Sequence, residues 1–330
     1  MRRPPRSSHV ESGEAVRAGR RRLARRRRTQ RRVALVALSI VVLAAALFVV
    51  VVRHDGSGPA GRPPRAHTAR SQASTGSARG GSRVARPLVQ RDRQVSSVPI
   101  LMYHVINAPP PNAAFPGLYV TPRDFALQMK ALAAAGYRGV TLDEVASSWK
   151  HRTSLPPGRP IVISFDNGYR SQYTNALSVL RRLRWPAVEN LQLSGLPPSQ
   201  GGLTTRQVRR LVRDGWELDT QGFSHADLPT LDARQLRHEV LGARIVLRNR
   251  FHVPVNWFCY PSGHYNSTVI AAVESAGYSG ATTVIPGWAS TTTDPYRLPR
   301  LRVLAGTTPS MLLTFIAATR DSSPPPAAYP

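Results

Sequence analysis

The part of this sequence most suited to chemistry is an apolar run that ends abruptly in polar residues. Residues 161–169 read Ile-Val-Ile-Ser-Phe-Asp-Asn-Gly-Tyr, so Asp166 follows directly on a strand-like segment. The carboxyl ends of parallel strands open onto a crevice in α/β proteins, and reactive side chains lie there. Asp166 is therefore the first candidate for a chemical role. The alternative is that it only caps the helix expected to begin near Ser171.

Two histidines stand in comparable places. His104 ends the apolar run 100–103, and His225 follows the strand-like segment 216–220 by a few residues. The single cysteine, Cys259, lies between aromatic residues, so it predicts a buried, inert thiol, and one cysteine cannot form an intramolecular disulfide. His104 has the alternative of being a core histidine at a strand end.

The elements that must position these residues alternate in type, which predicts an α/β domain with mainly parallel strands. Strands are expected at 99–103, 161–165, 187–193, 216–220, 257–260, 280–284 and 298–303. Helices are expected at 121–135, 171–183, 204–214, 232–250, 267–276 and 308–319. Asp232 is expected to cap a helix start, and Gly136 and Gly277 to mark helix ends. Seven strands with interposed helices favour a barrel over an open sheet.

Five segments resemble motifs of the polysaccharide deacetylase family, the NodB-like carbohydrate esterases. Phe165-Asp-Asn-Gly-Tyr169 is similar to its first metal motif, and Trp216-Glu-Leu-Asp-Thr-Gln-Gly-Phe-Ser-His-Ala-Asp-Leu228 to its second. The other three are Ile100-Leu-Met-Tyr-His104, Phe258-Cys-Tyr-Pro-Ser-Gly263 and Arg297-Leu-Pro-Arg-Leu-Arg302. The first of these resembles the opening strand of secreted deacetylases that act on poly-N-acetylglucosamine. The resemblance implies an irregular (β/α)7 barrel over residues 96–320.

The resemblance also implies a hydrolase that removes acetyl groups from N-acetylated sugars with a divalent, zinc-like metal held by one Asp and two His. Asp166 matches the general base, His104 the candidate acid and His225 a retained ligand position. Asn167 and Gln221 stand where the family has its ligand aspartate and its first ligand histidine. Neutral amides are poor ligands for zinc-like metals, so metal binding is expected to be weak or absent.

Two groups of residues extend the expected site. Asp219, Asp227 or His264 would have to replace the missing ligands if the metal site were rewired. The expected substrate groove contains Tyr169, Tyr260 and Pro261, with Trp288 as a further aromatic candidate. Core packing is the alternative role for Tyr260 and Trp288.

The first ninety-five residues have a different composition from the rest. Residues 1–32 carry thirteen arginines against Glu11 and Glu14, and residues 33–52 are free of charge. Twenty apolar residues are long enough to cross a bilayer, and the preceding arginines predict a cytoplasmic amino terminus. We therefore expect an uncleaved transmembrane signal anchor before the barrel, and a domain outside the cell.

Residues 53–95 are rich in Gly, Ser, Pro and Arg and predict a disordered basic stalk, and the proline-rich tail 321–330 is expected to be disordered as well. The arginine cluster suits anionic lipids, and nucleic acid is the less favoured partner of this charge. The resulting hypothesis is a cell-membrane protein that deacetylates cell-envelope polysaccharide, with catalysis possibly impaired. The alternative is a non-catalytic glycan-binding pseudoenzyme.

Overall fold

The computed structural model describes residues 95–194 and 201–330. The expected cytoplasmic tail, membrane span and all of the stalk except its last residue lie outside these ranges. Within the described ranges, no helix has the length and apolar character that a bilayer crossing needs.

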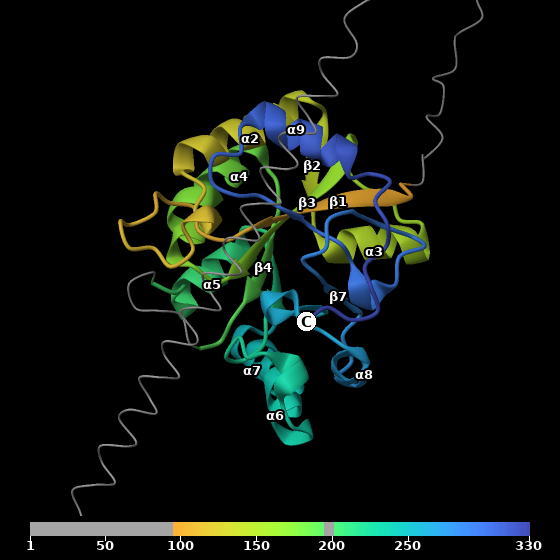
Figure 1. The fold of residues 1–330 in the computed structure, drawn as a ribbon. Helices are drawn as coiled ribbons and strands as arrows, with labels where there is room; N and C mark the ends of the chain where they lie inside the picture. The colour runs from red at the N-terminus through yellow and green to blue at the C-terminus, as the bar shows by residue number, and fades with distance from the viewer. Residues whose placement is uncertain (1–94, 195–200) are drawn as a thin grey trace, which may run out of the picture. The chain divides into compact units, whose positions relative to one another are not determined.

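Within the described residues, nine strands form one sheet that curls into a half-barrel (Figure 1). Its order is β7-β6-β5-β4-β3-β1-β8, with β2 paired to β3 and β9 paired to β1. All pairings are parallel except that of β8 with β1. The strands are β1 Ser97–Tyr103, β2 Tyr137–Val140, β3 Arg159–Asn167, β4 Val188–Leu191, β5 Glu217–Thr220, β6 Trp257–Cys259, β7 Gly280–Thr282, β8 Trp288–Ser290 and β9 Leu301–Arg302.

Helices follow most of the strands. They are α2 Pro122–Ala134, α3 Leu142–His151, α4 Leu177–Leu183, α5 Thr205–Arg213, α6 Ala233–Arg237, α7 Ala243–Phe251, α8 Ser267–Ser275 and α9 Pro309–Ala318. The expected caps are present: the Asp232 side chain accepts a hydrogen bond from the Gln235 backbone N–H. Gly136 and Gly277 adopt φ angles of 80° and 79° after α2 and α8, a left-handed conformation that glycine favours.

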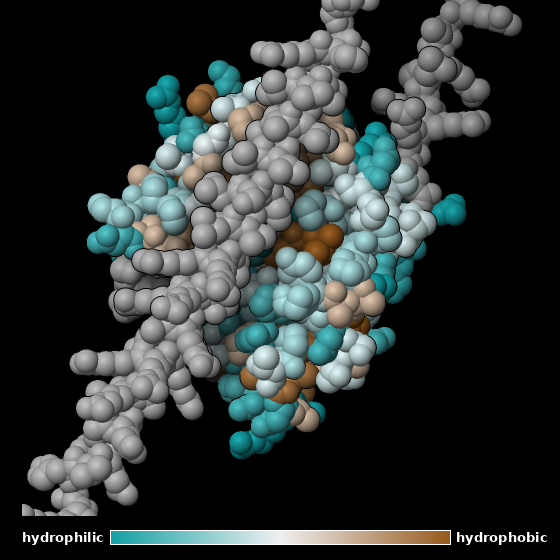
Figure 2. All heavy atoms as spheres, in the orientation of Figure 1, coloured by the Kyte–Doolittle hydropathy of each residue, from teal (hydrophilic) through white to brown (hydrophobic). Residues whose placement is uncertain are grey.

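The core lies in layers on the two faces of the sheet. Along β3, Ile161, Ile163 and Phe165 point outward into a cluster with α2, α4 and α9, which lie together in Figure 1. Val162 belongs to a second cluster on the inner face, two residues before Ser164 and four before Asp166. The period of two along a strand thus carries Asp166 to the inside of the curled sheet. On the coloured surface in Figure 2, hydrophilic residues predominate and hydrophobic ones form small patches.

The seven expected strands are all present, although several are shorter than the sequence suggested. The sequence missed β2, α3 and β8. The irregular barrel that the resemblance implied is present as a curled half-barrel. An isolated parallel bridge links Thr282 of β7 to Leu298, which lies three residues before β9.

The expectation of disorder in the carboxyl-terminal tail was wrong for part of that segment. Tyr329 and Tyr265 exchange backbone hydrogen bonds of 2.8 Å in both directions, and the Tyr265 hydroxyl donates to the Pro326 carbonyl at 2.6 Å. Proline lacks a backbone N–H but keeps its carbonyl, so a proline-rich segment can still be held by donors from the domain.

Candidate functional site

A pocket of about 530 Å³ lies at the carboxyl ends of β1, β3 and β5. His104, Asp166, Asn167, Gln221 and His225 all line it, although they span more than a hundred residues of sequence. The parallel pairing of these strands explains their meeting, because it brings the carboxyl ends to one edge of the sheet.

The end of β3 is shaped by two residues with left-handed backbones. Asn167 has φ 75° and Gly168 has φ 89°, a region that Asn tolerates and Gly adopts freely. A Cβ atom on Gly168 would stand 2.3 Å from Leu191 Cδ1, so only glycine fits this turn. The turn leaves Asp166 within the sheet and directs Asn167 toward the neighbouring strands.

Asp166 is held in a buried ion pair with Arg300. The Arg300 Nη1 and Nη2 groups donate to Asp166 Oδ1 and Oδ2 at 2.7 and 2.8 Å, and Asn190 Nδ2 donates to Oδ1 at 2.9 Å. Asp166 is 1% exposed and Arg300 is 0% exposed. A bidentate pair of this kind combines charge with fixed geometry.

The guanidinium of Arg300 has a partner for each of its donor groups. Its Nε donates to the Thr283 carbonyl at 2.8 Å, Nη1 also contacts Ser164 Oγ at 3.2 Å, and Nη2 contacts Cys259 Sγ at 3.2 Å. The buried thiol predicted for Cys259 is present at 0% exposure, and burial raises its pKa to about 12. The thiol is therefore a packing group beside the ion pair.

The ion pair sets the protonation state of Asp166. Burial alone would raise its pKa, but the charge and hydrogen bonds of Arg300 outweigh burial and hold the pKa at about 2. A carboxylate with so low a pKa is a weak base at neutral pH, where general bases work best with a pKa near the ambient pH.

His104 lies beside Asp166, with 4.0 Å between its Nε2 and Asp166 Oδ2. Burial lowers the pKa of His104 to about 4, although the Asp166 carboxylate opposes that shift. Its Nδ1 is buried without a hydrogen-bond partner among the described residues. Burial thus favours the neutral imidazole of His104 over its protonated form.

The two substituted ligand positions are joined to each other. The Asn167 backbone N–H donates to Gln221 Oε1 at 2.9 Å, and Asn167 Nδ2 donates to Gln192 Oε1 at 3.0 Å. Gln192 in turn donates to the Ser194 carbonyl. Gln221 Oε1 and Asn167 Nδ2 thus take part in hydrogen bonds that link the carboxyl ends of β3, β4 and β5.

His225 sits on the loop after β5, with φ 59°. The loop is fixed by Glu239, whose Oε2 accepts hydrogen bonds from the Phe223 and Ser224 backbone N–H groups at 2.8 and 2.9 Å. Glu239 belongs to a π-helical turn between α6 and α7, an irregularity often found near functional sites. Burial lowers the pKa of His225, which keeps its imidazole neutral.

These residues do not fit a zinc-like ion. His225 is the one imidazole at the three ligand positions, and the amide oxygen of Gln221 already accepts a hydrogen bond. In residues 95–194 and 201–330, no three His, Cys, Asp or Glu side chains gather closely enough to hold a metal. Carbonyl oxygens and one imidazole are a weak donor set for such ions.

The alternative ligands do not complete the set. Asp219 accepts hydrogen bonds from the Asn256 and Trp257 backbone N–H groups at 3.1 and 2.8 Å, and it does not line the pocket. Asp227 pairs with His264 at 3.0 Å, and neither lines the pocket. The rewired site is therefore disfavoured by the positions of all three residues.

Of the three residues expected in the substrate groove, two line the pocket and one does not. Tyr169 lines the pocket, and burial raises its pKa to about 12. Tyr260 also lines the pocket, but its hydroxyl donates to the Tyr296 carbonyl at 2.9 Å and its ring stacks on Tyr265. Pro261 is buried in the adjoining turn without lining the pocket. These contacts give Tyr260 and Pro261 a packing role.

Of the two roles considered for Trp288, the structure favours core packing. It lies on β8, away from the pocket lining, and its indole Nε1 donates to the Ile316 carbonyl at 2.9 Å.

Sequence reasoning missed Arg300, Asn190, Gln192 and Phe115. Arg300 is one of three arginines in the closing segment Arg297-Leu-Pro-Arg-Leu-Arg302, and nothing local marks it as the one that is buried. Phe115 lines the pocket from the loop after β1, where the sequence carries no strand or helix pattern. Asn190 and Gln192 gave no signal beyond being polar residues within and just beyond the β4 strand.

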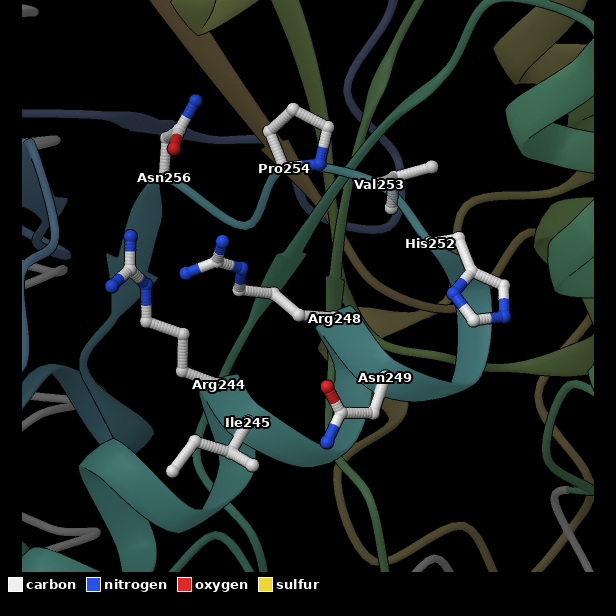
Figure 3. A pocket seen from close by; sticks show the side chains of 8 residues that line it. All are labelled: Arg244, Ile245, Arg248, Asn249, His252, Val253, Pro254 and Asn256. Carbon is white, nitrogen blue, oxygen red and sulfur yellow. The ribbon is translucent and has the colours of Figure 1, made fainter.

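A separate hollow of about 440 Å³ lies at the carboxyl end of α7 (Figure 3). Arg244 and Arg248 point toward the same space in it. Arg244 donates to the Val255 and Ala276 carbonyls at 2.8 Å each, and so links the loop before β6 to the residue that ends α8. None of the predicted site residues lines this hollow.

Comparisons with known proteins agree with this architecture. A sequence profile described as polysaccharide deacetylase matches residues 154–281. The chain is similar to the polysaccharide deacetylase YxkH of Bacillus subtilis, with 28% identity over 225 residues, which cover 68% of this chain and 78% of that protein. Over 62 residues, 18% of this chain and 9% of the relative, it is 36% identical to the poly-β-1,6-N-acetyl-D-glucosamine N-deacetylase of Escherichia coli.

Among solved structures, the Streptococcus pyogenes deacetylase PplD in complex with acetate superimposes with a TM-score of 0.61. The identity is 26%, and the match covers 67% of this chain and 98% of that one.

Proposed function

Because the chain belongs to the polysaccharide deacetylase family, we propose that its pocket takes N-acetylated polysaccharide of the cell envelope. The proposed reaction is hydrolysis of the acetamido C–N bond, with metal-dependent catalysis weak in this protein. The E. coli relative, whose name specifies poly-N-acetylglucosamine, supports this class of substrate.

The observation that carries the proposal is the hydrogen bond from the Asn167 backbone N–H to Gln221 Oε1. It joins the two positions at which the family has metal ligands, and it takes up one of the two lone pairs of the Gln221 amide oxygen. The rest of the pocket remains open, with the Asp166 carboxylate and the imidazoles of His104 and His225 along its wall.

Asp166 and His104 support the same conclusion. Deacetylation needs a base that takes a proton from water and an acid that gives one to the leaving amine. Asp166 is ionised and could accept a proton, but its pKa of about 2 makes it a weak base. Burial favours the neutral form of His104, and a neutral imidazole is a much weaker acid than the protonated ring.

The test is to measure acetate release from N-acetylglucosamine oligomers by the full chain, together with metal analysis of protein purified without chelator. We expect slow release or none, and less than one equivalent of transition metal. Rapid release with stoichiometric metal would overturn the proposed impairment and leave a fully active deacetylase.

The second candidate function is glycan binding without hydrolysis. It is favoured by the presence of Asn167 and Gln221 in the pocket lining, because amide groups that are poor metal ligands are good partners for hydroxyl and acetamido groups. Binding of the oligomers without any acetate release would select this candidate. Binding that collapses with added salt for any polyanion would point instead to phosphate contacts.

We also propose that residues 33–52 anchor the protein in the cell membrane, with the arginine cluster of residues 20–32 on anionic lipids of the cytoplasmic face and the pocket outside. The support is the uncharged run and the arginines before it. Protease added to intact cells should remove the domain and spare the amino-terminal tail. A soluble chain beginning within residues 53–95 would show that the segment is cleaved.

A further inference from the structure

The hollow of about 440 Å³ at the carboxyl end of α7 has a basic lining (Figure 3). Three of the residues that line it can carry a positive charge, and they are spaced by four along the chain: Arg244, Arg248 and His252. Residues four apart lie on one side of a helix, so the two arginines form a row that His252 continues at the helix end. None of the described residues that line the hollow is acidic.

Arg244 is held in place by the fold and keeps part of its guanidinium free. Its Nε and Nη1 groups donate to the Val255 and Ala276 carbonyls, and the guanidinium lies over the Tyr278 ring, 5.0 Å from the ring centroid. Its Nη2 forms no hydrogen bond in the part of the chain that the structure describes. A guanidinium fixed in this way loses little conformational entropy when its free N–H groups bind a ligand.

Arg248 has no partner that would explain its position. It is exposed, and no side-chain hydrogen bond or ion pair joins it to another described residue. Its place in the last turn of α7 suits the helix dipole, but that effect is small at an exposed position. Arg244 and Arg248 nevertheless point toward the same space (Figure 3).

The two arginines oppose each other electrostatically. Burial lowers the pKa of Arg244, and the positive charge of Arg248 lowers it further. The Asp219 carboxyl acts in the other direction, but it does not line the hollow, and its Oδ1 accepts hydrogen bonds from the Asn256 and Trp257 backbone N–H groups. An anion in the hollow would therefore relieve the repulsion between the guanidinium groups and would meet no carboxylate.

The basic surface continues from the hollow onto α5. Arg206, Arg209 and Arg213 are exposed and lie at positions i, i+3 and i+7, the spacing of one helix face. Arg209 Nη2 donates to the Arg250 carbonyl at 3.4 Å, which places this row beside the end of α7. A linear polyanion can therefore extend from the hollow along α5.

The composition of this surface distinguishes between classes of anionic ligand. Guanidinium groups match phosphoryl oxygens with paired, charge-assisted hydrogen bonds. Single-stranded nucleic acid usually binds through aromatic side chains on which bases stack, and none of the described residues that line the hollow or form α5 is Phe, Tyr or Trp. A concave hollow also fits a group that projects from a chain better than it fits a flat bilayer. These features favour a polymer of polyol or sugar units joined by phosphodiesters.

We propose that the hollow between Arg244 and Arg248 binds a phosphoryl group of such a polymer, and that the α5 arginines bind the neighbouring phosphates. The site is separate from the pocket that holds Asp166, because the two share no lining residue. The proposal therefore does not depend on the function of that pocket, and the two can fail independently.

The experiment measures how ligands protect individual arginines of the full chain from phenylglyoxal, a reagent that modifies guanidinium groups. Mass spectrometry of peptides reports each arginine separately, so the arginines of residues 1–32 do not obscure the result. The probes are inorganic phosphate, poly(glycerol phosphate), a single-stranded oligonucleotide and phosphatidylglycerol vesicles, compared at equal phosphate concentration. At about ten times its Kd, the poly(glycerol phosphate) should slow modification of Arg248 about tenfold. It should also protect the α5 arginines, whereas inorganic phosphate should protect the hollow alone.

Two controls accompany this measurement. Arg123 is the internal control, because it is an exposed arginine on α2 that does not line the hollow, and its modification should not change. Asn249→Asp places a carboxylate in the lining at an exposed position, and it should raise the polymer concentration needed for half-protection of Arg248 about tenfold. Asn107→Asp makes the same change at an exposed position away from the hollow and should have no effect. Thermal melts confirm that both variants are folded.

Each contrary result overturns a defined part of the proposal. Equal protection of Arg123 and Arg248 would show a general ionic effect, and no protection of Arg248 by the polymer would show that the hollow binds no phosphoryl group. Protection of Arg248 without the α5 arginines would confine the site to a single anion. Unchanged protection in Asn249→Asp would place the bound group outside the hollow. Stronger protection by the oligonucleotide or by the vesicles than by the polymer would assign the hollow to nucleic acid or to lipid instead.

Discussion

Replacing Arg300 with methionine tests whether the buried ion pair holds the site together. Arg300→Met keeps an unbranched side chain but removes all the donors that contact Asp166. Asp166 would retain a full hydrogen bond only from Asn190, plus a long contact of 3.6 Å with Cys259 Sγ. Removing one partner of a buried pair leaves an uncompensated charge and costs about 3–5 kcal/mol near pH 7.

The pH dependence of this loss follows from the pKa of Asp166. In the wild type the folded pKa is about 2, below the ordinary value of 3.8, which corresponds to about 2–3 kcal/mol at about 1.36 kcal/mol per pKa unit. That stability is present above pH 3.8 and disappears as the pH falls from 3.8 through 2.

In Arg300→Met the sign of the pH dependence reverses. Burial, now unopposed, raises the pKa of Asp166 above 3.8, so the folded protein holds a proton that the unfolded chain has released. Stability of the variant should therefore fall as the pH rises above 3.8, where the Asp166 contribution in wild type is constant. The difference between the two proteins should be smallest in acid and largest near neutral pH.

Urea unfolding of both proteins from about pH 3 to pH 8 measures this difference. Arg297→Met is the matched control, since Arg297 pairs with Asp294 at 2.8 Å in a more exposed place and should cost less than about 1 kcal/mol. Adding Asp166→Asn to Arg300→Met should recover part of the loss by removing the buried charge. A loss for Arg300→Met that is the same at acid and neutral pH would refute the assignment of the stability to this pair.

Three further changes have defined outcomes. Asn167→Asp with Gln221→His should create zinc binding measurable by calorimetry, whereas either change alone should do little because an incomplete ligand set binds weakly. Asp219→Asn should reduce the fall in urea stability between about pH 4 and pH 7, because burial raises the pKa of Asp219 to about 7 and the folded protein keeps a proton there. Arg244→Met should cost about 1–3 kcal/mol in urea unfolding by leaving two carbonyls unpaired, and Arg248→Met should stay within about 0.5 kcal/mol.

The contradicting results are equally definite. A folded double variant that binds no zinc would show that the strand ends no longer place a ligand set. An unchanged pH profile for Asp219→Asn would place the retained proton on Glu217, whose pKa is also raised by burial and by Asp219. If Arg244→Met and Arg248→Met lowered the free energy of unfolding equally, the hydrogen bonds of Arg244 to the two carbonyls would not contribute to stability.

Much of the fold was readable because its strands are short apolar runs between clear helix signals. The sequence does contain a signal for α3, because Thr141 and Glu144 have the spacing of a capping box, which marks the start of a helix. The sequence contains no comparable signal for β2, because Tyr-Arg-Gly-Val has neither a clear alternation of apolar and polar residues nor an apolar run. Gly139 in that strand is required by Trp185, whose Cβ would lie 2.7 Å from an added Cβ, and a contact across 46 positions leaves no local mark.

The sequence predicted which residues line the site, but not which residues they form hydrogen bonds and ion pairs with. Asp166, Asn167, Gln221, His225 and His104 could be grouped because motifs place them at strand ends. The partners that decide their behaviour are long-range: Arg300 lies 134 positions from Asp166. The hydrogen bond between Gln221 and Asn167 depends on the register of β3, β4 and β5, which sequence spacing does not give.

The presence of Asp166 does not by itself argue for catalysis. Its carboxylate neutralises Arg300, whose guanidinium also reaches Ser164, Thr283 and Cys259, so losing Asp166 would leave a buried cation at the centre of these contacts. Folding alone is therefore a sufficient reason for an acid at this position.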